Sequence, residues 1–265
     1  MKLDGDSALI TGASAGLGCE FARQLAGRMR SLILLARREQ QLNELRDELT
    51  QQHPNLVVHV RRTDLAEPRQ LKDLMAWLDH EKIDVHLLIN NAGLGDIGSF
   101  ATSDSRRNEQ IMLVNMVALT SLTRHLLPQM IARKRGGILN VSSSAGFLPI
   151  PGFAVYAASK AYVTSFSEAL HAEVRGTGVT VCALCPGPVR TEFQEVAKRS
   201  EGPVENAPEF AVVTVEQVVR DALRALESNR PLIIPGLKMK LSMLLVRMTP
   251  MPILRWASRF SAKRT

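Results

Sequence analysis

The residues best suited to chemistry in this sequence are Tyr156 and Lys160, four positions apart, with Ser143 thirteen positions upstream of the tyrosine. On a helix, side chains four residues apart lie on the same face. Such a pair occurs by chance in many helices. It is informative here because it follows, in order, a glycine-rich turn at residues 11–18. Together these features indicate a bound dinucleotide that moves a hydride while the tyrosine, lysine and serine move a proton at an oxygen atom.

The glycine-rich turn has the spacing Gly12-x-x-x-Gly16-x-Gly18. The short apolar run at residues 7–10 precedes it and predicts a buried strand, and apolar residues at helical spacing follow over residues 21–26. Glycines let the backbone approach a pyrophosphate, and the start of a helix offers it free N–H groups. An ordinary strand-to-helix turn is the alternative interpretation.

Two arginines, Arg37 and Arg38, directly follow the apolar run at residues 32–36, which predicts the second strand. NAD-binding units usually carry a carboxylate near this position, where it accepts a hydrogen bond from the ribose 2′-hydroxyl. A carboxylate would repel a 2′-phosphate, whereas an arginine fork can bind it through two hydrogen bonds. The sequence therefore favours NADP(H) over NAD(H), through Arg37 foremost and Arg38 second. The alternative is that both are solvated residues leading into the helix predicted at residues 39–50.

Beyond these two motifs, the chain resembles the short-chain dehydrogenase/reductase family over residues 3–235. The resemblance rests on motifs in the family's order and spacing: Thr11–Gly18, Asn90–Gly93, Asn115, Ser143, Tyr156 with Lys160, and Pro186 with Gly187. It implies an NAD(P)-dependent enzyme acting on CH–OH or C=O groups, from the branch with a three-glycine turn and NADP-type arginines. The rival interpretation is a catalytically silent NADP-binding sensor or scaffold protein of the same fold, against which the intact catalytic set argues.

The resemblance also implies a role for each catalytic candidate. Tyr156 would be the general acid when a carbonyl is reduced, or the base in the reverse reaction, and Ser143 would hydrogen-bond the substrate oxygen. Lys160 would bind the ribose hydroxyls and favour the tyrosinate, and Asn115 would order a water leading to it. A free tyrosine has a pKa of ~10, so half-ionisation at neutral pH requires this pKa to fall by ~3, which a neighbouring ammonium and an oxidised nicotinamide could largely bring about. The serines at 142–144 could instead be an ordinary strand end, from which only the spacing to Tyr156 selects the middle one.

For the cofactor, the resemblance places the adenine against Asp64, the adenosine ribose at residues 91–93 and the nicotinamide end at residues 186–191. The cofactor-binding residues predicted in this way are Gly12, Ser14, Ala15, Gly16, Leu17, Gly18, Arg37, Arg38, Asp64, Leu65, Asn91, Ala92, Gly93, Tyr156, Lys160, Pro186, Gly187, Val189 and Thr191. Asp64 could also cap the helix that follows it, since Glu67 stands three residues later. No metal is expected, because the six histidines show no metal-ligand spacing.

The pattern as a whole predicts an α/β fold: a Rossmann-like doubly wound parallel sheet of about seven strands in a single domain at residues 1–235. The predicted strands are near-continuous apolar runs, as parallel strands covered on both faces should be. Beyond those already named they are Leu56–Arg61, Leu87–Ile89, Gly137–Val141, Val179–Leu184 and Leu232–Ile234. Residues 190–213 are interpreted as a lid over the substrate or as a plain surface loop, and Thr214 begins a capping-box pattern that restarts a helix.

The cysteines, the N-terminus and the hydropathy argue against several classes of protein. Cys182 and Cys185 resemble a redox motif, but residues three apart on a strand point to opposite faces, so their sulfurs should not meet. Cys19 is expected on a helix, and three cysteines suit a reducing cytosol. No secretory signal is expected, and no run of about 18 apolar residues predicts a membrane span. We therefore expect a cytoplasmic protein.

The last thirty residues differ from the body in charge. The chain has 33 Lys+Arg against 26 Asp+Glu, and residues 236–265 hold seven of the basic residues and no acid. The body is therefore balanced at 26 against 26, and the whole net charge of +7 lies in the tail. A helical wheel separates an apolar face from a basic one: Ile253, Trp256, Ala257 and Phe260 against Arg255, Arg259 and Lys263. This pattern suits peripheral contact with anionic lipid, or a helix docked on the core or a second subunit. Nucleic acid is not expected, since no recognition motif accompanies the charge.

The sequence thus predicts an NADPH-dependent carbonyl reductase, or the reverse alcohol dehydrogenase, acting on a small molecule. Fatty acyl, steroid-like and small aldehyde or ketone substrates all stay open. Apolar residues that could line the pocket, or belong to the core, are Phe147, Leu148, Pro149, Ile150, Phe153 and Phe193. The helix carrying Tyr156 has further apolar residues, which together with the resemblance predict a homodimer or homotetramer: Val163, Phe166, Ala169 and Leu170.

Overall fold

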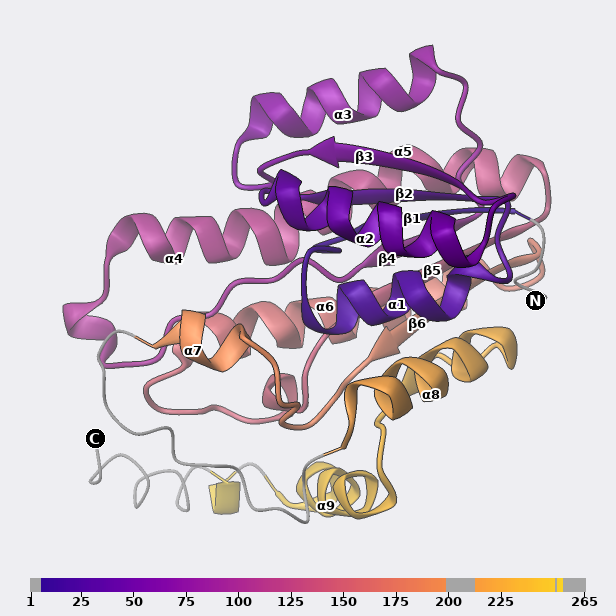
Figure 1. Ribbon diagram of the computed structural model, residues 1–265. Helices are drawn as coiled ribbons and strands as arrows, with labels where there is room; N and C mark the ends of the chain where they lie inside the picture. Colours follow the sequence, from indigo (N-terminus) through magenta and orange to yellow (C-terminus); the bar gives the residue numbers. More distant parts are fainter. Residues whose placement is uncertain (1–5, 199–212, 251, 255–265) are drawn as a thin grey trace.

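The computed structural model describes residues 6–198, 213–250 and 252–254, which fold around one seven-stranded parallel sheet (Figure 1). The strand order is β3-β2-β1-β4-β5-β6-β7. The strands are β1 (Ser7–Thr11), β2 (Ser31–Ala36), β3 (Val57–Arg62), β4 (Leu87–Asn90), β5 (Gly136–Val141), β6 (Val179–Leu184) and β7 (Leu232–Ile233). Since every pairing is parallel, all carboxyl ends lie along one edge of the sheet. The predicted doubly wound α/β fold is confirmed.

Helices cover the sheet on both faces, because the strands are apolar on both faces. Leu9 and Ile10, adjacent on β1, lie in different core clusters, as the alternation of side chains along a strand requires. The first cluster contains residues of α1 (Gly16–Ala26), α2 (Glu39–Gln52) and α8 (Val215–Glu227). The second contains residues of α3 (Pro68–His80), α4 (Ser105–Met112), α5 (Leu119–Ala132) and α6 (Ala154–Glu173). Three short segments lie between these elements: the 3-10 turns η1 (Phe100–Thr102) and η3 (Ser144–Phe147), and the helix α7 (Phe193–Ala197).

The predicted element boundaries agree with the structure to within two residues. β2 and β5 begin one residue earlier than predicted, and α2 extends to Gln52. Thr214 is the N-cap of α8, and its hydroxyl accepts a hydrogen bond from the Gln217 backbone N–H at 3.3 Å. The predicted helix start at Thr214, with its hydroxyl as the cap, is therefore confirmed. Most of the interpreted lid, residues 199–212, lies outside the described residues.

Two groups of buried residues bear on expectations from the sequence. Cys182 and Cys185 are free thiols in different core clusters, in agreement with the strand argument. The helical stretch Ser105–Ala132 is long and apolar enough to cross a membrane by length and composition, and scattered polar residues hid it from a search for an unbroken apolar run. Its Ile111 and Leu122 are buried against the sheet, which is the environment of a core helix.

The helix α9 (Leu237–Met248) follows β7 and begins the basic tail. Met239, Met243 and Val246 on this helix belong to a small apolar cluster with Cys185 and Ile234 of the body. The part of the tail that the structure describes therefore contacts the domain. Of the amphipathic wheel predicted from the sequence, all residues except Ile253 lie outside the described residues: Arg255, Trp256, Ala257, Arg259, Phe260 and Lys263.

Candidate active site

The glycine-rich turn between β1 and α1 has a shape that only glycine allows. Gly12 and Gly16 have positive φ angles of 66° and 53°. A Cβ atom on Gly18 would lie 2.2 Å from the carbonyl oxygen of Gly12. The N-cap of α1, Ala15, makes no side-chain cap hydrogen bond, so the first N–H groups of the helix remain available to an anion. The turn therefore fits the pyrophosphate of a dinucleotide.

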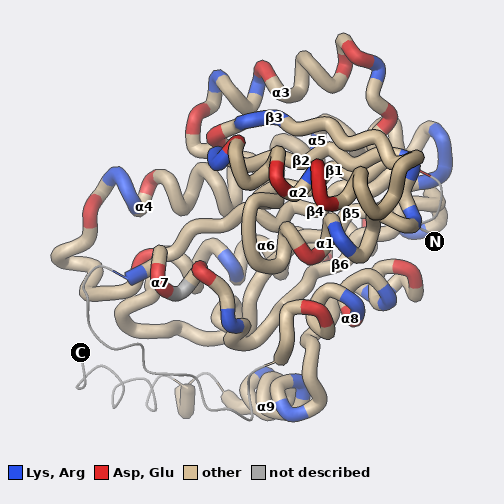
Figure 2. The backbone as a smooth tube through the Cα atoms, viewed as in Figure 1, with Lys and Arg blue, Asp and Glu red and all other residues tan. Residues whose placement is uncertain are grey.

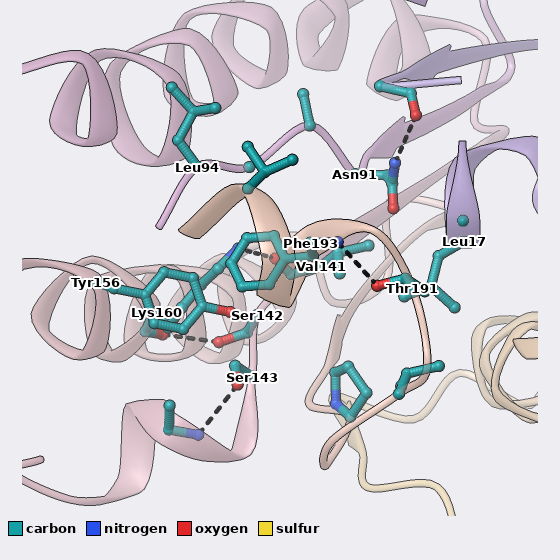
Figure 3. Close-up of a pocket in the computed structure, with 18 of the residues that line it drawn as sticks. Leu17, Asn91, Leu94, Val141, Ser142, Ser143, Tyr156, Lys160, Thr191 and Phe193 are labelled. Carbon is teal, nitrogen blue, oxygen red and sulfur yellow. Dashed lines mark hydrogen bonds between the residues drawn. The ribbon is translucent and has the colours of Figure 1, made fainter. Parts of the chain in front are cut away.

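Asn91, directly after β4, holds this turn from the side (Figure 3). Its Nδ2 donates to the carbonyl oxygens of Thr11 at 2.9 Å and Gly12 at 3.2 Å. The Thr11 hydroxyl in return accepts from the backbone N–H groups of Asn91 and Ala92, both at 2.9 Å. The Asn91 side chain thus positions the turn, and Thr11 shares this work although it was not among the predicted site residues. A hydroxyl at a strand end beside the glycines was the signal that could have found it.

The two arginines at the end of β2 have different surroundings. Arg37 is half exposed, with Nη1 4.0 Å from Oδ2 of Asp64. Arg38 donates from Nη1 to Oε2 of Glu192 at 3.0 Å and from Nε to Oγ of Ser14 at 3.3 Å. Both side chains line the same cavity as the glycine turn. Arg37 is thus the less engaged cation at the strand end, while Arg38 ties the turn to the segment before α7.

Asp64 and Leu65 follow β3 and also line the cavity. Oδ1 of Asp64 accepts from the backbone N–H of Ala66 at 3.0 Å, a turn within the loop. The helix α3 begins at Pro68 with Glu67 as its N-cap and without a side-chain cap hydrogen bond. The alternative that Asp64 caps this helix is therefore wrong, because the helix starts three residues too late for its carboxylate.

Tyr156 and Lys160 lie on the buried side of α6, beside the end of β5 (Figure 3). The Lys160 ammonium lies 5.6 Å from the centre of the tyrosine ring and donates to the Val141 carbonyl oxygen at 2.8 Å. Burial raises the pKa of Tyr156 to about 12, and a hydrogen bond with Ser143 lowers it by less. Burial lowers the pKa of Lys160 to about 8. Within the protein alone, loss of hydration therefore outweighs the neighbouring groups, and a shift toward tyrosinate in the presence of oxidised nicotinamide stays a prediction.

The three consecutive serines after β5 have three separate roles. Ser142 is buried, and its hydroxyl donates to the Lys160 carbonyl oxygen at 2.7 Å. Ser143 hydrogen-bonds Tyr156, and its Oγ accepts from the Ala145 N–H at 3.1 Å. The N–H of Ser144 donates to the carbonyl oxygen of Pro186. Of the three, Ser143 therefore has the hydroxyl that contacts Tyr156, which is the one that the spacing selects.

Asn115 lies in a π-helical segment, η2 (Leu113–Ala118), between α4 and α5. Its side chain accepts from the Leu94 N–H at 2.8 Å and donates to the Leu94 carbonyl oxygen at 3.0 Å and to Ser159 Oγ at 2.9 Å. A Cβ on Gly93 would lie 3.4 Å from Lys160 Nζ and 3.5 Å from Asn115 Oδ1. The amide therefore anchors the loop after β4 close to the lysine, and its role in ordering a water stays a prediction. Short π-helical segments are frequent at functional sites.

The segment after β6 closes the cavity from the opposite side. Pro186, Gly187, Val189 and Thr191 all line it, as predicted for the nicotinamide end. A Cβ on Gly16 would lie 3.1 Å from Thr191 Cγ2, so this segment runs directly beside the glycine turn. A Cβ on Gly187 would lie 2.5 Å from the Met239 methyl group, so α9 packs closely there.

An apolar wall surrounds Tyr156 on the side away from the arginines. The tyrosine ring stacks on Phe153 at 4.2 Å between ring centres, and Phe193 of α7 lies 5.3 Å away. The apolar residues of this wall are Leu94, Ile97, Val114, Leu148, Ile150, Phe153, Phe193, Val196, Met239 and Met243. Phe147 and Pro149, predicted with them, are not among the cavity-lining residues. The two methionines were missed because only the packing of α9 brings them to the site.

All predicted site residues but two line one cavity of about 1150 Å³. The exceptions are Gly18, buried beneath the turn, and Asn115, buried behind the loop after β4. The cavity lies at the carboxyl ends of β1, β4, β5 and β6, where the strand order reverses between β1 and β4. Open α/β sheets bind their ligands at this position. Its two ends differ in chemistry, with arginines at one and apolar side chains at the other.

Comparison with known families and proteins agrees with this geometry. The family model for short chain dehydrogenase matches residues 6–202. An NADP-dependent 3-hydroxy acid dehydrogenase of Escherichia coli K12 is 33% identical over 218 residues, which cover 81% of this chain and 86% of that protein. A very-long-chain 3-oxoacyl-CoA reductase of Anas platyrhynchos is 31% identical over 225 residues, 82% of this chain and 67% of that protein. The chain spans only 62% of a counterpart of that reductase in Caenorhabditis elegans.

Solved structures extend the likeness to nearly the whole chain. A short-chain dehydrogenase from Sphingobium yanoikuyae in complex with NADPH has 29% identity and a TM-score of 0.80, covering 98% of this chain and 94% of that one. A 7β-hydroxysteroid dehydrogenase has 26% identity and a TM-score of 0.84, covering 97% and 99%.

Proposed function

Because the chain belongs to the short chain dehydrogenase family, we propose that it uses NADPH to reduce an apolar ketone or aldehyde to the alcohol. The protein is an oxidoreductase of CH–OH or C=O groups. The finer proposal rests on one observation: Tyr156 and Ser143 lie in a single cavity between an arginine-bearing end and an apolar end. A dinucleotide phosphate suits the first end, and an apolar carbonyl compound suits the second.

The side chains around the tyrosine supply proton transfer and alignment. Bound NADPH would supply the hydride that reduces the carbonyl carbon. The Ser143 hydroxyl hydrogen-bonds the carbonyl oxygen and orients it, and Tyr156 gives that oxygen its proton. A phenol whose pKa is raised to about 12 is fully protonated at neutral pH, which is the form that a proton donor needs. Lys160, held by the Val141 carbonyl oxygen at 2.8 Å, is placed to bind ribose hydroxyls beside the tyrosine.

Arg37 carries the proposed preference for NADPH. Its half-exposed guanidinium follows the strand that ends beside the glycine turn, and Asp64 at 4.0 Å is its weak partner. The fork can therefore turn to a 2′-phosphate at little cost. Solved relatives support this choice in part, since one binds NADPH and a serine dehydrogenase binds NADP+, whereas another relative holds NAD.

The substrate class follows from the apolar wall around Tyr156. The names of relatives point to 3-oxoacyl thioesters, 3-hydroxy acids and hydroxysteroids as substrates of those proteins. A panel of ketones and aldehydes with increasing apolar surface, assayed by NADPH oxidation, tests the proposal. We expect kcat/KM to rise with apolar surface. A preference for small charged carbonyls would contradict it, and NADPH binding without turnover of any carbonyl would favour the silent sensor.

We propose in addition that the protein is a homo-oligomer. Of the four residues of α6 that the sequence indicated, Val163 and Leu170 are buried, whereas Phe166 is half-buried and Ala169 is exposed. The exposed large apolar residues near them are Met112, Val117 and Tyr162, on α4, η2 and α6. Sedimentation of the wild type and of Val117→Asp tests this surface. We expect an oligomer that the variant weakens, and a monomer at micromolar concentration would contradict the proposal.

A further inference from the structure

The helix α9 has two faces with different surroundings. Its inner residues Met239, Ser242 and Met243 line the cavity, so the helix forms part of the wall at the apolar end. Its outer face carries five large apolar side chains that are 53% to 73% exposed: Leu237, Leu241, Leu244, Leu245 and Met248. Five exposed large apolar side chains on one short helix form a patch of the kind that marks an interaction site.

The outer residues follow helical spacing and so form one stripe along α9. At 3.6 residues per turn, positions 237, 241, 244, 245 and 248 fall within about 100° of the helix circumference. Lys238 borders the stripe on one side, and Lys240 and Arg247 border it on the other; all three are exposed. Figure 2 shows basic and no acidic positions along this helix. The sequence from residue 236 onward contains no acid at all.

We propose that this outer face of α9 docks the protein on an anionic lipid surface. The leucines and Met248 would enter the boundary between headgroups and acyl chains, and the flanking lysine side chains would reach the phosphates. A second copy of the chain fits the stripe less well, because pairing two such helices would bring their basic borders together. With the stripe in lipid, the cavity wall formed by Met239 and Met243 stands directly above the membrane, where apolar carbonyl compounds concentrate.

The test is co-sedimentation of the full chain with vesicles of phosphatidylcholine alone or mixed with phosphatidylglycerol. One variant interrupts the stripe, Leu241→Gln with Leu245→Gln; a second reverses the charge of two border residues, Lys238→Glu with Lys240→Glu. Matched controls change exposed residues elsewhere: Val57→Gln with Ile131→Gln, and Arg69→Glu with Lys72→Glu on α3, which lies at the opposite end of the molecule (Figure 1).

We expect the wild type and both controls to bind the mixed vesicles and to be released by salt, since exposed charges are screened within ~8 Å at physiological ionic strength. Each α9 variant should bind at least about tenfold more weakly. Equal, negligible binding to both vesicle types would overturn the proposal, and so would binding that the α9 variants leave unchanged. A loss of oligomerisation in the α9 variants without any lipid binding would assign the stripe to a second copy instead. None of these readouts depends on turnover, so the docking proposal and the proposed reaction can fail separately.

Discussion

The two ends of the cavity are built by different means. At the cofactor end two glycines of the turn approach backbone atoms closely: a Cβ on Gly12 would lie 2.9 Å from the Ala92 Cα, and one on Gly18 2.2 Å from a carbonyl oxygen. At the substrate end the wall consists of side chains from separate segments, among them Leu94, Phe153 and Met239. Backbone contact permits one residue type, whereas a side-chain wall accepts many apolar residues of similar volume. The cofactor end can therefore be recognised in the sequence as a motif, whereas the substrate end shows only as a set of apolar residues.

Between the two ends stands the pair Tyr156 and Lys160, whose chemistry depends on burial. Neither side chain is more than a tenth exposed. Burial raises the tyrosine pKa and lowers the lysine pKa, so it favours the neutral form of each side chain. A buried ammonium lowers the stability of the folded protein, so its retention beside the tyrosine is expected only where function requires it.

The largest effect should come from Tyr156→Phe, which removes the proton donor and leaves both ends of the cavity in place. We expect turnover to fall about a thousandfold or more, because general acid catalysis contributes about 10²–10⁴-fold. NADPH affinity, measured by fluorescence titration, should change by less than about threefold. Turnover within tenfold of wild type would remove Tyr156 from the mechanism.

Gly18→Ala tests whether the backbone contacts at the cofactor end exclude every residue with a side chain. The added methyl group would meet the Gly12 carbonyl oxygen at 2.2 Å, so the turn must shift. We expect a loss of about 3 kcal/mol in the free energy of unfolding and weaker NADPH binding. Gly27→Ala is the matched control, because Gly27 has a φ of −78° and the nearest atom belongs to the flexible His53 side chain at 3.2 Å. Similar melting temperatures for the two variants would contradict the view that the backbone contacts at residue 18 permit only glycine.

Arg37→Asp should change cofactor choice without changing the substrate end. It removes a cationic fork and adds a repulsive carboxylate, and hydrogen bonds to charged groups contribute about 1.5–3 kcal/mol. The ratio of kcat/KM for NADPH over NADH should therefore fall by about tenfold to a hundredfold. Arg38→Asp, which breaks the contact with Glu192 instead, should change the ratio less. An unchanged ratio in the Arg37 variant would make that residue an ordinary surface arginine.

Lys160→Met should stabilise the cofactor-free protein while removing activity. Lowering the lysine pKa from 10.5 to about 8 corresponds to about 3 kcal/mol of unfavourable burial of the charge. The lost hydrogen bond to the Val141 carbonyl oxygen offsets about 1–2 kcal/mol of this. We therefore expect a net gain of about 1–2 kcal/mol in the free energy of unfolding at pH 7.

The stability gain in this variant should depend on pH, because the lysine charge is its source. Below pH 8 the folded wild type holds the buried ammonium and its full cost. Between pH 8 and 10.5 the folded lysine loses its proton while the unfolded one keeps it, so wild-type stability rises with pH. The difference between variant and wild type in denaturant melts should therefore shrink from pH 7 to pH 10. A difference that does not vary with pH would show that packing, and not charge burial, is responsible.

The sequence by itself determined the parallel sheet, its strand positions and the residues of the cofactor end. Strands buried on both faces are near-continuous apolar runs, as residues 32–36 and 179–184 are, so their pattern can be recognised without a structure. The glycines of the turn and the serine, tyrosine and lysine were identifiable because each role requires one residue type at a constant spacing. The choice of Ser143 among three serines followed from that spacing, and the structure shows that its hydroxyl contacts the tyrosine.

Only the tertiary structure decided which groups meet across long separations in the chain. Asp64 was a credible helix cap until the helix proved to begin at Pro68. Val163 and Leu170, predicted to face a second subunit, proved to be buried, because an apolar helix does not indicate which of its faces the sheet covers. The tyrosine pKa depended on burial, which no local pattern specifies. Met239 and Met243 entered the cavity wall because α9 folds back across the carboxyl ends of the strands, and the same packing leaves its leucine stripe exposed.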